Sequence, residues 1–376
     1  MIKFLAKDSK TTMSHNDNLI AANPIYRHMN VDKIIDQAKE KLDTTNWETA
    51  AGFSSGMIIT PSGVKFDGRL QNFMYRDVTV HRYNNEKYRH YFELSNMLGD
   101  KGCTDKISAI TITNKNKHKD YVLHYATRME GISDAGKAEI PQPPNTFNAI
   151  TLYIEISPWS NVNLHEHVWK DSACKIFRIV YLVREGADLT LHREFKSGFT
   201  PTPDVKQVIE SRIIQHPASK VNVKSSSYGT FDYIQDLFFV KAYKKTTTNI
   251  TNRYVVNNKQ SVHSIADVEH IGEEGKSEVD VKSITNDTSK FTFAGNIKVL
   301  KEAEKVDANL QNKNLQLSDT AVVVTEPKLD ISTKEIACTH GCTVSSVDPE
   351  QLYLLNTRGF DNDRAKEILT EAFLNE

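Results

Sequence analysis

The fold of this chain is decided by residues 291–355, which begin FTFAGNIKVL and contain the motif CTHGC at 338–342. Apolar residues recur there on alternate positions, in the pairs Phe291 and Phe293, Ile297 and Val299, Leu315 and Leu317, and Leu329 and Ile331. A period of two places these side chains on one face of an extended chain. Turn-forming pairs separate the runs, namely Gly295-Asn296, Ser318-Asp319 and Glu326-Pro327. The pattern predicts short strands joined by tight corners.

The same stretch carries a family resemblance in five motifs. They are GNIKV (295–299), VDANLQNKNLQLS (306–318), PKLDI (327–331), CTHG (338–341) and RGF (358–360), the last preceded by Tyr353. In order and spacing they resemble the closing third of the SufB/SufD family. The His-Gly pair followed by a helix and an Arg-Gly pair resembles SufD rather than SufB. This resemblance implies a parallel β-helix. No motif upstream of about Phe147 takes part in it.

Composition limits the classes of partner. The 376 residues are 39% hydrophobic and 25% charged, and 47 basic residues against 48 acidic ones give a formal charge of -1. No overall basic field is available to hold nucleic acid or an anionic membrane. No apolar run approaches the roughly 18 residues of a membrane span. Four cysteines without a CxxC pair suit a reducing compartment, so we expect a cytoplasmic protein.

Five segments are expected along the chain. They are a polar lead-in (1–30), an N-terminal α+β lobe (31–139), a Pro-rich linker (140–146), a β-helix core (147–337) and a C-terminal loop with helices (338–376). An i, i+3, i+4, i+7 apolar stripe predicts a helix over 31–42, and turn signals around 57–66 predict a hairpin.

After the linker, strand-length runs follow one another with no helical stripe between them. This pattern by itself suits a sandwich, a barrel or a solenoid, and the resemblance selects the parallel β-helix.

Residues 70–137 mix aromatic and basic side chains, which could form a base-stacking platform for nucleic acid. Acidic residues in the same segment, such as Asp77 and Glu93, neutralise this patch, so an ordinary surface is favoured. The glycine-rich run from Gly52 to Gly68 contains neither GxGxxG nor GxxxxGK[ST] and is interpreted as turns.

Cys338, His340 and Cys342 offer thiol and imidazole ligands of the kind that iron and zinc take, in an expected loop after a strand. Three ligands do not close a tetrahedron, and the residues alone favour two buried thiols and a hydrogen-bonded histidine. The resemblance implies that His340 faces a SufB-like subunit where a nascent iron–sulfur cluster forms, with Cys338 as second choice. Cys342 stands where the family has a small residue. No stably bound cofactor is expected, only transient iron or nascent cluster.

Two helices are expected at the end of the chain. Asp348 can cap the first, Pro349 suits its first position, and Gly359 can end it. The second follows Asp361 and has an apolar stripe that would dock on this chain or on a partner. The resemblance implies a seat for a SufC-like ATPase, for which the candidate residues are Leu352, Tyr353, Ile368, Leu369, Ala372 and Phe373.

A rival interpretation is a metal-dependent, cupin-like enzyme. His165 and His167 lie at i and i+2 on a possible strand, hence on one face, with Glu166 between them. A solvated histidine pair is favoured over a metal site because no glycine-rich cupin pattern surrounds it. The sequence is therefore interpreted as a SufD-like scaffold subunit, not an enzyme, that pairs with a SufB-like subunit and a SufC-like ATPase.

Overall fold

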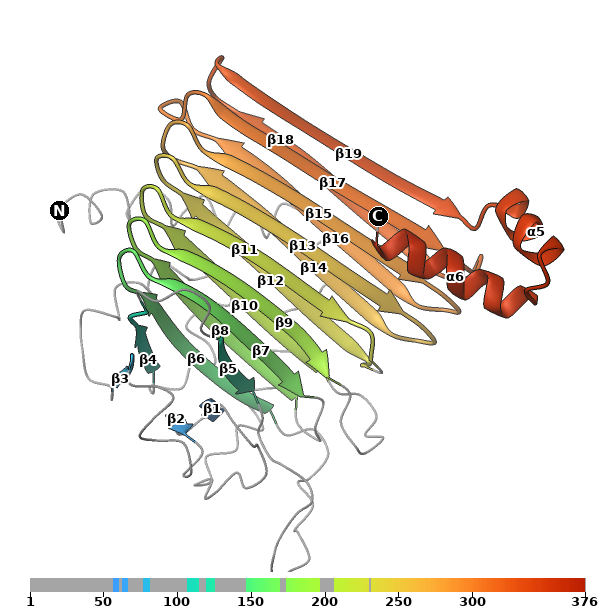
Figure 1. The fold of residues 1–376 in the computed structure, drawn as a ribbon, viewed down its shortest axis with the longest axis horizontal. Coiled ribbons are helices and arrows are strands. Elements are labelled where there is room, and N and C mark those ends of the chain that lie inside the picture. Colours follow the sequence, from blue (N-terminus) through green and yellow to red (C-terminus); the bar gives the residue numbers. More distant parts are fainter. Residues whose placement is uncertain are drawn as a thin grey trace, which may run out of the picture.

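The computed structural model describes residues 57–60, 63–66, 77–81, 107–114, 120–125, 147–169, 174–196, 206–229 and 231–375. They form a parallel β-solenoid of about six turns followed by two helices, α5 and α6, which project from one end of the strands (Figure 1). The predicted parallel β-helix with a short C-terminal helical segment is confirmed.

The solenoid is built from two sheets whose strands alternate along the chain. The first sheet has the order β19 (Ile336–Ser346), β17 (Val306–Gln316), β15 (Lys276–Thr285), β13 (Thr247–Val256), β11 (Lys220–Ser227), β9 (Asp188–Lys196), β7 (Asn161–Trp169), β5 (Asp120–Tyr125), β1 (Met57–Thr60) and β2 (Gly63–Phe66). The second has the order β18 (Val322–Ile331), β16 (Lys290–Val299), β14 (Ser261–His270), β12 (Tyr233–Ala242), β10 (Lys206–Gln215), β8 (Cys174–Val183), β6 (Phe147–Ile156), β4 (Ile107–Ile112) and β3 (Val78–His81).

The apolar residues that alternate in the sequence form a core in which the buried side chains of successive coils are stacked. In β13 every second residue is buried, and Ile250, Val279 and Leu310 are aligned on successive coils and are all fully buried. Each coil therefore covers the apolar inner face of its neighbour, as in other solenoids. This is why the strand periodicity could be found in the sequence although no single coil would be stable by itself.

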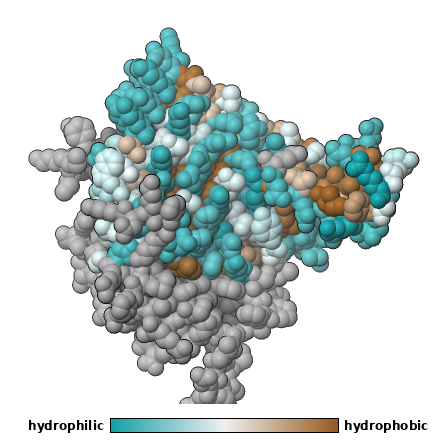
Figure 2. All heavy atoms as spheres, in the orientation of Figure 1, coloured by the Kyte–Doolittle hydropathy of each residue, from teal (hydrophilic) through white to brown (hydrophobic). Residues whose placement is uncertain are grey.

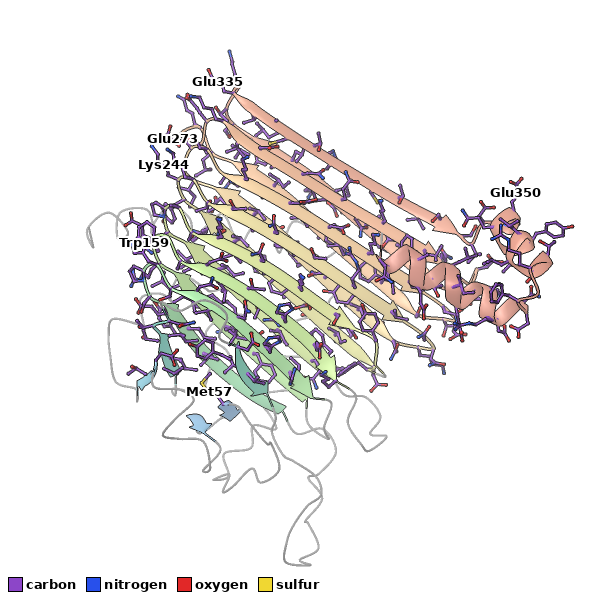
Figure 3. All side chains as sticks on the ribbon, viewed as in Figure 1. Met57, Trp159, Lys244, Glu273, Glu335 and Glu350 are labelled. Atoms are coloured by element: carbon purple, nitrogen blue, oxygen red, sulfur yellow. The ribbon has the colours of Figure 1, made fainter. Side chains whose placement is uncertain are left out.

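The corners between the sheets repeat as well. Ala218, Lys245, Glu274 and Lys305 each adopt a positive φ of 58–59°. The backbone N–H of each donates to a carbonyl of the next coil, for example Lys245 to Glu273 at 2.9 Å and Glu274 to Glu304 at 2.8 Å. Figure 3 shows Trp159, Lys244, Glu273 and Glu335 along this edge of the solenoid, at the opposite end of the strands from Glu350 on the helices. The corners thus extend the hydrogen-bonded ladder beyond the strands.

The N-terminal predictions have mixed outcomes. The hairpin around residues 57–66 is confirmed, because β1 and β2 pair antiparallel. Strands β4 and β5 pair in parallel with β6 and β7, so both sheets continue across the predicted linker. The lead-in, the helix over 31–42 and the linker itself lie outside the described residues.

Both helices begin where the sequence predicted, and the first also ends there. Helix α5 (Pro349–Thr357) is capped by Asp348, whose Oδ1 accepts from the N–H of Glu350 at 2.9 Å, and Gly359 follows with φ 93°. In α6 (Asn362–Asn375), Asp361 accepts from the N–H of Arg364 at 2.8 Å. Within the described part of the chain, no helix combines the length and the apolar character needed to span a membrane.

A buried charged network crosses the interior of the solenoid. Arg193 donates to Glu166 Oε2 from Nε and Nη2 at 2.9 and 2.8 Å, to Asp236 Oδ1 at 2.7 Å and to Ser211 at 2.8 Å. Tyr181 donates to the other oxygen of Glu166, and Tyr254 donates to Asp236 Oδ2 at 2.8 Å. All three charged residues are 0% exposed. Their burial is tolerable only because nearly every charged atom has a partner.

Replacing Arg193 by Met should leave Glu166 and Asp236 buried without a counter-charge. We expect a loss of about 3–5 kcal/mol in the free energy of unfolding, measured by urea denaturation at neutral pH. The control is Arg184→Met, which removes an ion pair with Glu155 whose side chains are 23% and 13% exposed, and it should cost less than Arg193→Met because the remaining carboxylate still reaches water. Equal losses in the two variants would show that the buried network contributes nothing special.

Candidate functional site

The C-terminal end of the solenoid is an open coil. Strand β18 pairs only with β16, and β19 only with β17, so among the described strands both have one free edge. Free edges of this kind present unpaired N–H and C=O groups that can pair with another chain. The two edges belong to the same last coil, which therefore offers a double attachment surface.

The CTHGC motif lies on one of these edges. We expected it in a loop after a strand, and that expectation was wrong, because residues 338–342 lie inside β19. The strand forms because the segment Ile336–Ser346 continues the parallel register of β17 for its whole length. The solenoid therefore extends beyond residue 337, the predicted end of the β-helix core.

The register decides where the motif points. Cys338, His340 and Cys342 are aligned with Ala308, Leu310 and Asn312 of β17, which are all buried inside the solenoid. Residues aligned in a parallel ladder project from the same face of the sheet. The three side chains therefore project toward the inside of the last coil, yet His340 and Cys342 are exposed and Cys338 is half-buried because no further described coil covers them.

Polar side chains form a floor beneath Cys342. Its Sγ lies 3.3 Å from Thr325 Oγ1 and 3.9 Å from Asn312 Oδ1. Thr325 donates to the same Asn312 oxygen at 2.8 Å, and Asn314 donates to it at 2.7 Å. Asn312 and Asn314 are fully buried. The open end of the solenoid is therefore polar at one side of His340 and not uniformly apolar.

The motif by itself does not form a metal site. In the described ranges no group of three His, Cys, Asp or Glu side chains is placed to hold a metal ion. Alternate residues of one strand are roughly 6.5–7 Å apart, so three ligands on β19 cannot converge on one ion. Any metal contact at His340 therefore needs ligands supplied from opposite the open coil.

The Cys338 thiol is held in its protonated form. Burial raises the pKa of Cys338, and the nearby Asp307 carboxylate raises it further. Thiolate is the form that attacks electrophiles and ligates metals, so Cys338 is a weaker ligand than its position suggests unless its surroundings change.

The apolar candidates on the helices fall into two groups. Tyr353 is 71% exposed and Leu354 and Phe360 are also exposed, whereas Leu352, Ile368, Leu369 and Phe373 are half-buried and Ala372 is exposed. Figure 2 shows hydrophobic residues gathered on this projecting part of the molecule. We refer to residues 349–375, which contain both helices, as the helical arm.

The histidine pair of the rival interpretation is not arranged as a metal centre. His165 and His167 share the outer face of β7, as predicted, but Glu166 points inward and is bound by Arg193. The ring of His165 stacks on His192 with a centroid distance of 4.8 Å and lies 3.7 Å from an Asp120 oxygen, and His167 lies 3.9 Å from Glu194. The cupin-like enzyme is therefore not favoured.

Sequence reasoning missed three features: the Arg193 network, the polar floor of Asn312 and Thr325, and the contacts of Arg253 and Lys282 with α6. Each depends on contacts between residues of different secondary-structure elements, for example Thr325 with Asn312, 13 positions apart, and Arg253 with Leu374, 121 positions apart. An unusual density of polar residues at alternate positions, such as Asn312 and Asn314, was the only available signal.

Comparison with known proteins supplies a family. Residues 145–373 match the family model described as SUF system FeS cluster assembly, SufBD core domain. The chain is 36% identical over 92 residues to the iron–sulfur cluster assembly protein SufD of Escherichia coli K12, covering 24% of this chain and 22% of that protein. It is 32% identical over 95 residues to the SufBD family protein slr0076 of Synechocystis, covering 25% and 21%.

A longer match is with the chloroplastic protein ABCI7 of Arabidopsis thaliana, at 24% identity over 226 residues, which is 52% of this chain and 47% of that protein. The matched segments thus span less than half the length of each of these relatives.

The open coil predicts different reactivities for its two described cysteines. Iodoacetamide should alkylate exposed Cys342 about tenfold faster than Cys338 near neutral pH, followed by mass spectrometry of the peptides. Asp307→Asn should speed alkylation of Cys338 by roughly twofold, because the carboxylate is the smaller cause of its raised pKa. Asp330→Asn, an exposed change on β18, should have no effect. Faster alkylation of Cys338 than of Cys342 would contradict the inward, half-buried placement.

Proposed function

Since this chain belongs to the SufBD core family of the SUF iron–sulfur cluster assembly system, we propose that it is a SufD-like scaffold subunit. In this proposal it pairs through its last coil with a SufB-like subunit, carries a SufC-like ATPase on its helical arm, and supports the entry of iron without catalysing a reaction of its own. Its cysteine content, with no CxxC pair, fits work in the reducing cytoplasm.

The open last coil is the observation that carries the proposal. The free edges of β18 and β19 lie on either side of inner residues that are exposed only because no described coil follows. A second β-solenoid with a free last coil would satisfy the unpaired backbone groups of both strands and cover the apolar positions Val323, Leu329 and Ile336, which are half-buried in the isolated chain. A SufB-like subunit is a partner of this kind.

His340 would then face the junction between the two subunits. Its imidazole is a borderline ligand suited to iron, and Cys338 on the same face offers a thiol that becomes a ligand once deprotonated. Because β19 alone cannot surround an ion, the remaining ligands would come from the partner. A shared and incomplete ligand set suits iron that is bound transiently as cargo rather than held as a resident cofactor.

The helical arm is the proposed ATPase seat. Tyr353, Leu354 and Phe360 are large apolar side chains that water now covers. Burying such side chains is favourable by about 1.5–3 kcal/mol each, and exposed apolar groups gathered on one projection are typical of interaction sites. The arm begins directly after β19, so one proposed partner would bind along the edge of this strand and the other on the helices that follow it.

Replacing His340 by Ala should leave assembly intact and lower cluster formation. In a complex reconstituted with SufB-like and SufC-like subunits, we expect co-elution as for the unmodified chain and a decrease of about tenfold in iron and sulfide incorporated. Cys338→Ala should cause a smaller decrease.

The control is Thr339→Ala, which changes the exposed outer face of the same strand. Unchanged cluster formation by the His340 variant would remove the role given to this imidazole. Stoichiometric metal in the isolated chain that is lost with His167→Ala would favour the enzyme instead.

The double change Tyr353→Ser with Leu354→Ser should abolish co-purification of the ATPase while the SufB-like subunit is still retained. The expected decrease in affinity is at least about 100-fold, because two buried apolar anchors are lost. Glu350→Ser, on the exposed first turn of the same helix, is the matched control. Retention of the ATPase by the double variant would place its seat elsewhere.

A further inference from the structure

The helical arm returns to the body of the solenoid at its far end. Arg253 Nε donates to the carbonyl oxygen of Leu374 at 3.0 Å, and Lys282 Nζ donates to that of Phe373 at 2.8 Å. These carbonyls belong to the last turn of α6 (Asn362–Asn375), whose C=O groups have no partner within the helix. Two cationic side chains of the solenoid therefore cap the C-terminus of the arm.

The two cations are built into the sheet for this contact. Arg253 of β13 and Lys282 of β15 are aligned neighbours in the parallel ladder and project from the same outer face. Lys282 is only 1% exposed, and its Nζ lies 5.4 Å from the centre of the Phe373 ring. Arg253 is held by the carbonyls of Asn252 and Asp280 at 3.0 Å and by the Asp280 carboxylate. Arg253 is thus held by groups of the solenoid itself, and Lys282 is enclosed where the sheet and the helix meet.

Charge explains why cations occupy these positions. The C-terminal end of a helix carries a partial negative charge, which nearby cations stabilise. Helix α6 has no basic residue in its own last turn. The solenoid supplies the missing charge, and the half-buried Phe373 and Leu374 add apolar contact. Electrostatics and packing therefore favour the same docked position.

The helical arm is attached to the solenoid at two places. The arm is joined covalently to β19, the last strand of its sheet, while its far end is held at β13 and β15. Strand β17 lies between them, and its aligned residue Lys313 occupies the next position of the same ladder. The arm therefore spans β17 and is attached to the solenoid at both ends.

From these contacts we propose that Arg253 and Lys282 are positioning residues that fix the direction of the helical arm. They hold its C-terminus across the last coils, so that the arm presents Tyr353, Leu354 and Phe360 in one orientation. This deepens the proposed function and rests on it, because the ATPase seat is the surface being oriented. An arm held at both ends is preorganised and loses less conformational freedom when a partner binds.

The test begins with the full-length chain alone. Amide hydrogen exchange of α6 should become about tenfold faster in the double variant Arg253→Met with Lys282→Met, because two charge-assisted hydrogen bonds are lost. Exchange in β7 to β11 should stay unchanged, which shows that the solenoid remains folded.

Two single variants serve as controls. In Lys282→Arg, with Arg253 unchanged, exchange of α6 should stay slow because a cationic donor is kept. Lys313→Met, one coil further along the ladder, is the matched control and should have no effect. Unchanged exchange of α6 in the double variant overturns the proposal.

A second measurement separates positioning from simple stabilisation of the helix. The double variant keeps every exposed apolar side chain of the seat, so the SufC-like ATPase should still bind to it, but about tenfold more weakly. The single variant Lys282→Arg, in which Arg253 is present, should bind the ATPase with the affinity of the unmodified chain. Equal affinities for the double variant and the unmodified chain would overturn the orienting role. Failure of the ATPase to bind the unmodified chain would count against the proposed function, while the exchange experiment would still decide whether the two cations hold the arm.

Discussion

The parallel register between successive coils is the constraint on which the rest of this structure depends. Each strand inside the stack pairs with the strands one coil before and one coil after, and the corners add further bonds such as Lys245 N–H to Glu273 O. Backbone groups and inner side chains are satisfied only where a neighbouring coil is present. Among the described coils these requirements are not met at the last one, which is formed by β18 and β19.

The polarity of the buried side chains changes along the length of the stack. Much of it is aliphatic, as in the aligned series Ile250, Val279 and Leu310, but the Arg193 network buries a cation with two carboxylates. Near the open coil the polar character returns with Asn312, Asn314 and Thr325. Buried polar groups cost free energy unless they are paired, so the pairing of these side chains restricts which coil can lie above which.

Strand β19 connects the two proposed activities of the chain. It contributes His340 to the inside of the last coil, and it continues through Asp348 into the helical arm. The arm then returns to β13 and β15, so a force applied to its apolar surface is divided between the last strand and strands nearer the middle of the sheet. The cap contacts of Arg253 and Lys282 are the hydrogen bonds of that second attachment, and the apolar contacts of Phe373 and Leu374 add to them.

The sequence by itself determined the local structure of this protein. Alternation from Phe291 to Ile331 gave strands, and the residues Asp348, Pro349 and Gly359 gave the ends of α5, because the periodicities of side chains and the capping of helices depend on neighbours only a few positions away. The motif CTHGC, with its thiols and imidazole, could also be recognised as the candidate site. Only the tertiary structure decided that the motif is a strand, that His340 faces inward and that α6 docks on Lys282. Successive coils are separated by about 30 residues, as between Leu310 and His340, and alternation cannot specify which residues are aligned across that distance or which face of a strand is covered.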